Sequence, residues 1–134
     1  MKVFVDTAAW IALLNTEDDL HFAAKQVRDE LQQQKASLVT TDFVLIEVAD
    51  ALCVPSLRQK TITFINRLRK VKNLQIVPVS EVLLAQGWAL YSQRPDKDWG
   101  ITDCISFVVM TQAEITQAFT SDRHFEQAGF MKLL

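Results

Sequence analysis

Short apolar runs alternate along the chain with longer segments whose apolar residues recur every three or four positions. The first run, residues 2–5, is rich in β-branched and aromatic side chains and stops at the carboxylate of Asp6. Such a run is typical of a strand buried in the middle of a sheet. Strong helix formers fill residues 8–14. The pattern therefore predicts a central strand that leads directly into a helix beginning near Thr7.

The same alternation continues to the end of the chain. It predicts further strands at residues 37–40, 74–79, 118–120 and 130–134. It predicts further helices at about residues 19–34, 43–53, 56–72, 80–91, 104–110 and 123–128. Strands that alternate with helices, without hairpin signals, favour a parallel sheet with helices on both faces. No repeat or linker divides the chain, so residues 1–134 are expected to form a single α/β domain.

The composition agrees with one folded domain. The chain has 134 residues, of which 49% are hydrophobic, and it contains only three glycines and three prolines. This length supports a substantial hydrophobic core. The composition excludes the disordered and fibrous classes of protein.

The sequence also bears on where the protein is found. No apolar run is long enough to span a membrane, and Asp6 interrupts the apolar N-terminus where a signal peptide would continue. Cys53 and Cys104 follow hydrophobic neighbours and lack the spacing of a metal site. We therefore expect a cytoplasmic protein without a membrane segment, in which both cysteines are reduced core residues.

A net charge of −2 gives the protein no overall attraction for nucleic acid. Positive charge is concentrated in the predicted helix 56–72, which has no acidic residue. Its basic residues are Arg58, Lys60, Arg67, Arg69, Lys70 and Lys72. Arg67 and Lys70, three positions apart, share a helix face. That face is either simply solvated, a contact surface for RNA phosphates, or a docking face for an acidic partner.

Four acidic residues occupy notable positions in this pattern. Asp6 and Asp122 each follow a short strand, and would share a crevice if those strands were neighbours where the strand order reverses. Glu47 interrupts a helix that is apolar nearly all round. An ionised glutamate buried there is costly unless it is paired, coordinates a cation or reaches water at the rim. Taken singly, Asp6 is expected to be a helix N-cap and Asp103 a first-turn acid favoured by the helix dipole.

Taken together, the four acids predict a metal site. Carboxylates that share one crevice cannot all stay ionised without a cation, and hard oxygen ligands select Mg²⁺ or Mn²⁺ rather than zinc. A carboxylate-bound divalent ion can orient a phosphodiester and activate a water molecule. The chain has no GxxxxGK, GxGxxG or GxSxG motif, and His21 and His124 have no obvious serine or cysteine to serve.

Four segments, in their order along the chain, resemble the motifs of PIN-domain ribonucleases, and in particular of VapC-like toxins from bacterial toxin–antitoxin pairs. The segments are Val3–Trp10, Leu45–Val48, Thr102–Phe107 and Thr120–Phe125. The resemblance covers essentially the whole chain. It implies a three-layer α/β/α fold around a five-stranded parallel sheet.

The resemblance also implies a function. The implied catalytic quartet, which binds Mg²⁺ or Mn²⁺, is Asp6, Glu47, Asp103 and Asp122. The implied substrate is single-stranded RNA, and the implied partners are an antitoxin protein and a second copy of the chain. Thr7 and Thr120 match hydroxyl positions that support the acids. Asp98, with Asp96, falls just before the third motif and is expected to be an auxiliary acid only.

Other functions remain open at this stage. A signalling receiver domain also has acids at strand ends, but it expects an acidic pair at the first strand and a lysine after the last interior strand. Asp6 has no acidic neighbour and Asp122 is followed by Arg123, which disfavours that class. A PIN-fold module that only binds RNA or protein is disfavoured because all four acids are present. A housekeeping RNA-processing nuclease without an antitoxin is a further alternative.

Overall fold

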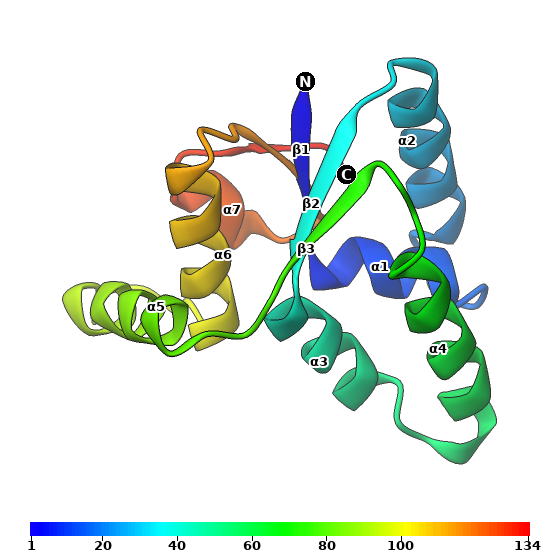
Figure 1. Cartoon of the computed structure of the whole chain (residues 1–134), viewed down its shortest axis with the longest axis horizontal. Helices are drawn as coiled ribbons and strands as arrows, with labels where there is room; N and C mark the ends of the chain where they lie inside the picture. The colour runs from blue at the N-terminus through cyan, green and yellow to red at the C-terminus, as the bar shows by residue number, and fades with distance from the viewer.

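All five strands run parallel in one sheet, in the order β3-β2-β1-β4-β5 (Figure 1). The computed structural model describes residues 1–134. The strands are β1 (Lys2–Val5), β2 (Ser37–Thr41), β3 (Leu74–Val77), β4 (Gln117–Phe119) and β5 (Met131–Lys132). The helices are α1 (Thr7–Leu14), α2 (His21–Gln33), α3 (Asp42–Ala51), α4 (Pro55–Leu68), α5 (Glu81–Gln93), α6 (Ile101–Gln112) and α7 (Arg123–Gln127).

The first strand occupies the centre of the sheet, as predicted. Phe4 pairs with Val39 of β2 on one side, and Val5 pairs with Phe119 of β4 on the other. Val3, Phe4 and Val5 are fully buried, which accounts for the continuous apolar run. The chain builds one half of the sheet through β2 and β3 and then returns for β4 and β5. The strand order therefore reverses between β1 and β4, where ligands of open α/β sheets bind.

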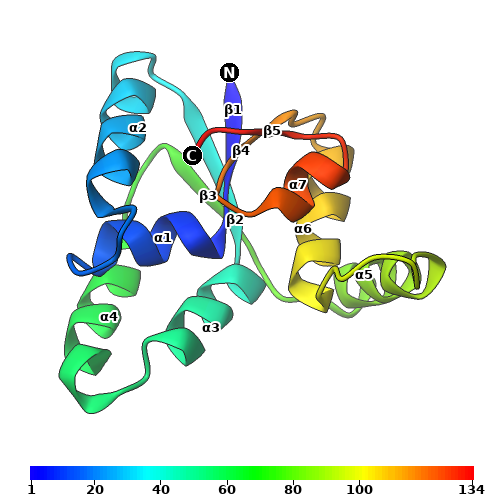
Figure 2. The same ribbon diagram turned by 180° about the vertical axis from the view of Figure 1, so that it is seen from behind.

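Helices cover both faces of the sheet (Figures 1 and 2). Helices α1, α2 and α4 lie on one side, and α6 and α7 lie on the other, with α5 packed against α6. Helix α3 lies beyond the carboxyl ends of the strands and contacts both α1 and α6. The expected three-layer α/β/α architecture is therefore confirmed. None of the helices combines the length and apolarity needed to cross a bilayer.

Several helix boundaries differ from the predicted ones for local reasons. Helix α4 begins at Pro55, one residue before the expected Ser56, because the fixed φ of proline suits the first helical position. It ends at Leu68 rather than near Lys72. Helix α6 begins at Ile101, three residues early, since Gly100 takes the N-cap position. Helix α3 begins at Asp42, one residue before the expected 43, since Thr41 caps it: the Thr41 hydroxyl accepts a hydrogen bond from the Val44 amide.

The two cysteines have different environments. Cys104 is fully buried in the core, as expected, and Cys53 is exposed. The expectation that both are core residues was wrong for Cys53 because α3 ends at Ala51. Cys53 therefore lies in the connection between α3 and α4, where its carbonyl oxygen accepts hydrogen bonds from the Arg58 guanidinium.

Close packing between α5 and α6 depends on Gly87. A Cβ atom at this position would lie 2.3 Å from Cγ1 of Ile105 and 3.3 Å from its Cα, and Ile105 is buried. We predict that Gly87→Ala lowers the free energy of unfolding by roughly 1–3 kcal/mol, despite the better helix propensity of alanine. Chemical denaturation measures this change.

Gly100→Ala is the matched control, because a Cβ there meets no atom within 4 Å and the backbone φ of −72° suits any residue. We expect it to change stability by no more than about 0.5 kcal/mol. Equal stability of the two variants would show that Gly87 is not required for the contact.

Candidate active site

Asp6 lies buried at the carboxyl end of the central strand. Its amide donates to the Phe119 carbonyl at 3.1 Å, which extends the pairing of β1 with β4 by one residue. Its carbonyl accepts from the amides of Ala9 and Trp10, so its backbone takes the N-cap position of α1. The carboxylate, however, makes no capping hydrogen bond. Asp6 is therefore the N-cap residue by backbone position, as expected, but its side chain does not cap the helix and contacts other partners.

One buried hydroxyl links the two acids that follow strands. Thr120 Oγ1 donates to Asp6 Oδ2 at 2.8 Å and accepts from the Asp122 amide at 3.0 Å. Thr120 is fully buried, so no water competes for these bonds. Asp122 in turn caps α7, where its Oδ1 accepts from the His124 amide at 2.9 Å. Strands β1 and β4 are neighbours, as the expected crevice requires, and Thr120 contacts the carboxyl of Asp6 and the backbone of Asp122.

Glu47 reaches the site from the solvent side of α3. Its Oε1 accepts a hydrogen bond from the hydroxyl of Thr7, the buried first residue of α1. The expectation that α3 is buried all round was wrong, because α3 turns one face to the strands and the other to water. Its exposed residues include Ile46, Glu47, Ala49 and Asp50. Glu47 therefore keeps contact with water while holding Thr7, as the rim alternative predicted.

Asp103 enters the site from the first turn of α6. Its Oδ2 accepts a hydrogen bond from the Gly100 amide at 3.3 Å. The same oxygen lies 3.0 Å from Nδ1 of His124, and that nitrogen is 3.4 Å from Oδ1 of Asp122. The Nδ1 atom of His124, on α7, thus lies between the carboxylates of Asp103 and Asp122.

Nothing in the sequence predicted this position for His124. The residue lies two positions after Asp122, and no serine or cysteine is placed for it to activate. The spacing of two residues between Asp122 and His124 was the available signal. The side chain of an N-cap aspartate accepts a hydrogen bond from the amide two residues later, and this bond holds residue 124 close to the edge of the sheet. Only the fold then shows that the first turn of α6 reaches the same place.

Burial and the neighbouring carboxylates raise the pKa of two of the four acids, Asp6 and Asp103. The pKa of Asp6 is raised from 3.8 to about 7, chiefly by burial, and the carboxylates of Asp103 and Glu47 also raise it. Hydrogen bonds from Thr120 and from the backbone of Thr7 oppose this rise. Burial likewise raises the pKa of Asp103, with Asp122 adding to the rise and the hydrogen bond to His124 opposing it.

These interactions connect the acids in a continuous series. Glu47 and Asp103 both act on Asp6, and Asp122 acts on Asp103. Crowded carboxylate oxygens with raised pKa values suit a divalent cation, which favours their ionised forms. The residues present therefore fit a Mg²⁺ or Mn²⁺ site.

The two auxiliary acids lie outside this series. Asp96 is exposed and forms a two-point ion pair with Arg94, with both oxygen–nitrogen distances at 3.0 Å. That hydrogen bonding lowers the pKa of Asp96. Asp98 is exposed and lines a groove beside Gly100 and Cys104. Neither residue shares a hydrogen bond with the four acids.

The buried carboxyl of Asp6 predicts a pH-dependent stability in the absence of divalent cations. Because the folded protein binds the Asp6 proton more tightly than the unfolded chain, protonation stabilises the folded state. The free energy of unfolding should therefore fall as pH rises from about 4 to about 7, by up to about 4 kcal/mol from this group. Asp6→Asn should abolish this part of the decline. Urea denaturation in EDTA between pH 4.5 and 8 measures both profiles, and parallel profiles would contradict the prediction.

The hydroxyl of Thr120 provides a second prediction. Thr120→Val keeps the side-chain shape but removes the donor to Asp6, so the pKa of Asp6 should rise above its wild-type value. It also leaves the partly buried Asp122 amide without this acceptor, at a cost of about 1 kcal/mol. Thr120→Ser, which keeps the hydroxyl, is the control and should retain the wild-type pKa. Carboxyl ¹³C NMR titration measures it, and equal pKa values in the two variants would exclude a role for the hydroxyl.

Comparisons with known proteins identify the family of the chain. The sequence profile of the PIN domain matches residues 3–131. The chain is 26% identical over 131 residues to VapC20 of Mycobacterium tuberculosis, a 23S rRNA-specific endonuclease, with 98% of this chain and 97% of VapC20 covered.

Solved structures have the same fold. The crystal structure of VapC20, a Sarcin-Ricin loop cleaving toxin, superposes with a TM-score of 0.84 at 27% identity and covers 96% of each chain. VapBC2 from Rickettsia felis, solved bound to a promoter DNA fragment, gives a TM-score of 0.69 at 13% identity over 98% of this chain and 97% of its own. FitAcB from Neisseria gonorrhoeae gives a TM-score of 0.66 at 16% identity, over 98% of this chain and 96% of its own. The chain therefore belongs to the PIN-domain family and is homologous to the endonuclease VapC20.

Proposed function

We propose that the protein is a metal-dependent endoribonuclease that cleaves single-stranded RNA, as the toxin of a toxin–antitoxin pair. The observation that carries the proposal is the convergence of acids from four separate elements at the carboxyl ends of β1 and β4. The proposed ligands of Mg²⁺ or Mn²⁺ are Asp6, Glu47, Asp103 and Asp122. The homology to VapC20, which acts on 23S rRNA, supports the choice of RNA as substrate.

The residues of the chain hold this site ready for its ligand. Thr120 fixes the orientation of Asp6, and Thr7 fixes that of Glu47, through one hydroxyl each. Asp6 follows the central strand β1, and Glu47 lies on helix α3. Attachment to regular elements keeps the oxygen atoms of both acids in place. A bound divalent cation supplies charge neutralisation for a phosphodiester and an activated water molecule. The exposed side of Glu47 leaves the site open to a chain entering from solvent.

The cleavage assay follows from these assignments. Asp6→Asn and Glu47→Gln should each lower cleavage of labelled single-stranded RNA by at least ~100-fold, since each loses a proposed ligand. Asp50→Asn is the control, because Asp50 is exposed on α3 one turn from Glu47 and makes no ion pair. EDTA should abolish wild-type activity, and Mg²⁺ or Mn²⁺ should restore it and raise the melting temperature of the wild type more than that of Asp6→Asn. Cleavage that persists in EDTA would refute the proposal.

This assay also separates the competing functions. A PIN-fold module that binds RNA or protein without cleaving it predicts RNA binding with no metal-dependent products. A housekeeping nuclease predicts cleavage without any antitoxin that inhibits it.

We propose that the protein works in the reducing cytoplasm, which agrees with its two free cysteines and with the proposed RNA substrate.

We propose that RNA outside the acidic crevice is held by the basic face of α4. Two of its cations are already engaged: Arg69 pairs with Asp42 at 2.8 Å, and Arg58 binds the Cys53 carbonyl. Arg67 and Lys70 are exposed and form no ion pair. Lys60 and Arg67 also border a hollow beside the C-terminal end of α1. Because α4 ends at Leu68, only Arg67 belongs to the helix, and Lys70 lies in the turn that follows it rather than on a shared helix face as expected. Arg67 and Lys70 are therefore the two cations in and just after this helix best placed to contact phosphates.

Replacing both residues tests the RNA contact. Arg67→Ala with Lys70→Ala should weaken RNA binding similarly for different sequences and reduce the slope of log affinity against log salt by up to about two contacts. The matched control is Lys25→Ala with Arg28→Ala, which removes two cations three positions apart on α2. Fluorescence anisotropy at several salt concentrations measures both slopes. Equal slopes in the two double variants would leave the α4 face as a solvated surface.

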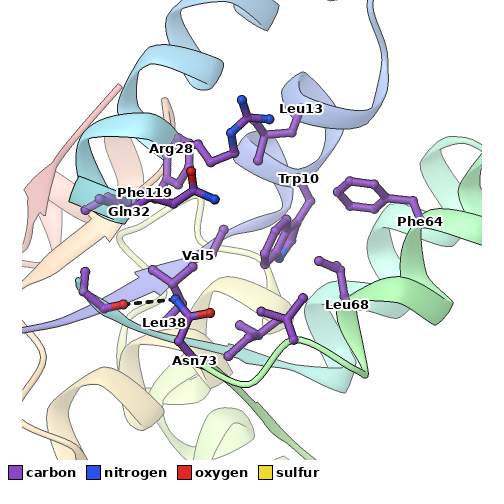
Figure 3. Close-up of a pocket in the computed structure, with 14 residues that line it drawn as sticks. Val5, Trp10, Leu13, Arg28, Gln32, Leu38, Phe64, Leu68, Asn73 and Phe119 are labelled. Atoms are coloured by element: carbon purple, nitrogen blue, oxygen red, sulfur yellow. Dashed lines mark hydrogen bonds between the residues drawn. The ribbon is translucent and has the colours of Figure 1, made fainter. Parts of the chain in front are cut away.

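An apolar cavity of about 200 Å³ lies between the sheet and the helices α1, α2 and α4. Figure 3 shows Trp10 of α1, Phe64 and Leu68 of α4, and Val5 of β1 around it, with Arg28 and Gln32 of α2 at its rim. Such a cavity suits the apolar side chains of a bound peptide. We propose that a segment of the antitoxin packs here, on the face of the sheet that carries α1, α2 and α4.

We also propose that the chain forms a homodimer through the outer face of α5. This face exposes Leu84, Trp88 and Tyr91, and the rings of Trp88 and Tyr91 stack with centroids 5.2 Å apart. Clustered exposed apolar side chains mark interaction surfaces, and a two-fold dimer needs only one self-complementary patch. Sedimentation equilibrium gives the molecular mass in solution that tests this proposal.

A further inference from the structure

His124 lies among the acids but has no part in the chemistry assigned so far. Its Nδ1 is 3.0 Å from Asp103 Oδ2 and 3.4 Å from Asp122 Oδ1. Nδ1 and one carboxylate oxygen from each aspartate lie within 4.8 Å of one another, and all three side chains are partly accessible. This is the tightest group of potential metal ligands in the protein.

These separations match the corners of one coordination shell. An octahedral ion with bonds of about 2.1 Å places adjacent ligand atoms roughly 3.0 Å apart and opposite ones roughly 4.2 Å apart. The two distances from Nδ1, 3.0 and 3.4 Å, lie near the value for adjacent ligands. We propose that Nδ1 of His124 is a direct ligand of the divalent cation held by Asp103 and Asp122, and that it makes the site favour Mn²⁺ over Mg²⁺. This inference rests on the proposed function, since it concerns the same metal site.

The surroundings of His124 hold its ring in place. Its own amide is bound to Asp122 Oδ1, and the next residue, Phe125, is fully buried and anchors α7. On the other side, the Gly100 amide holds the Asp103 oxygen that faces Nδ1. With carboxylate acceptors alone, the ring carries its hydrogen on Nδ1. With a cation between them, the neutral ring carries the hydrogen on Nε2 and presents the Nδ1 lone pair to the metal.

The remainder of the site offers only oxygen atoms. Asp6 is supported by the Thr120 hydroxyl and Glu47 by the Thr7 hydroxyl. Mg²⁺ prefers such oxygen ligands, and a nitrogen ligand favours transition metals over Mg²⁺. His124 thus gives the Asp103–Asp122 half of the site a metal preference that the carboxylates alone lack.

The chain is well suited to a spectroscopic test, because it has only two histidines. His21 is buried, and its Nδ1 lies 2.7 Å from the Ala12 carbonyl oxygen within the core. Pulsed electron paramagnetic resonance of Mn²⁺ bound to the complete protein should detect coupling to an imidazole nitrogen. Protein labelled with ¹⁵N only in the histidine rings should show that coupling change from ¹⁴N to ¹⁵N.

His124→Asn separates ligation from hydrogen bonding. The asparagine amide carries an N–H close to the position of Nδ1 and can still donate to Asp103, but it offers no imidazole lone pair. We expect this variant to lose the nitrogen coupling and to bind Mn²⁺ about tenfold more weakly, with a smaller loss of Mg²⁺ affinity. Calorimetric titration with each ion gives the two affinities. His21→Asn is the control and should retain the coupling.

Three results are distinguishable. Histidine coupling in the labelled wild type that is lost in His124→Asn supports the inference. Mn²⁺ that binds without any histidine coupling overturns the inference and leaves the metal-dependent nuclease intact. A wild-type protein that binds neither Mn²⁺ nor Mg²⁺ overturns both.

Discussion

The burial of the Asp6 carboxyl at the end of the central strand shapes the structure around it. Both faces of β1 are covered by helices and both edges are paired, so this side chain has almost no access to water. A charge in such a place needs a compensating partner. Within the protein the Asp6 carboxyl receives a hydrogen bond from the Thr7 backbone and one from the hydroxyl of Thr120, the residue that follows β4 in the neighbouring strand position. The site therefore requires the strand order that places β4 beside β1, because only this order brings Thr120 to Asp6.

The four acids are supported in two different ways. Asp6 and Glu47 each accept a hydrogen bond from a threonine hydroxyl, one on β4's extension and one at the start of α1. Asp103 and Asp122 instead face an imidazole nitrogen between them. The first half is rich in oxygen and partly buried, whereas the second carries a nitrogen donor. A single crevice thus combines two chemical environments at the same sheet edge.

The sequence predicted elements best where periodicity and burial coincide. The apolar run before Asp6 specified a central strand, and the alternation of strands and helices specified the parallel sheet. Helix ends were less predictable because caps decide them locally, as Pro55 and Gly100 show. The burial of α3 was misjudged because apolar residues such as Ile46 remain exposed at 52%, and composition alone does not say which face of a helix meets the sheet.

For the acidic residues, too, local features were predictable from the sequence and contacts between distant segments were not. The positions of Asp6 and Asp122 at strand ends were readable, since a strand and the residue after it are local in sequence. The side-chain role of Asp6 was not readable from its own neighbourhood, where a helix cap was the simplest interpretation. His124 escaped prediction because its partner Asp103 lies 21 residues away along the chain and meets it only through the packing of α6 on α7.

The hydrogen bond between Thr120 and Asp6 joins residues that are 114 positions apart. Contacts between residues so distant in sequence form only after the intervening chain has closed, which makes them late events in folding. The first strand leaves the ribosome long before the segment that carries Thr120, Asp122 and His124. During synthesis, therefore, a growing chain holds at most a fraction of the acidic cluster. The proposed metal site can therefore be complete only when nearly the whole polypeptide has been made.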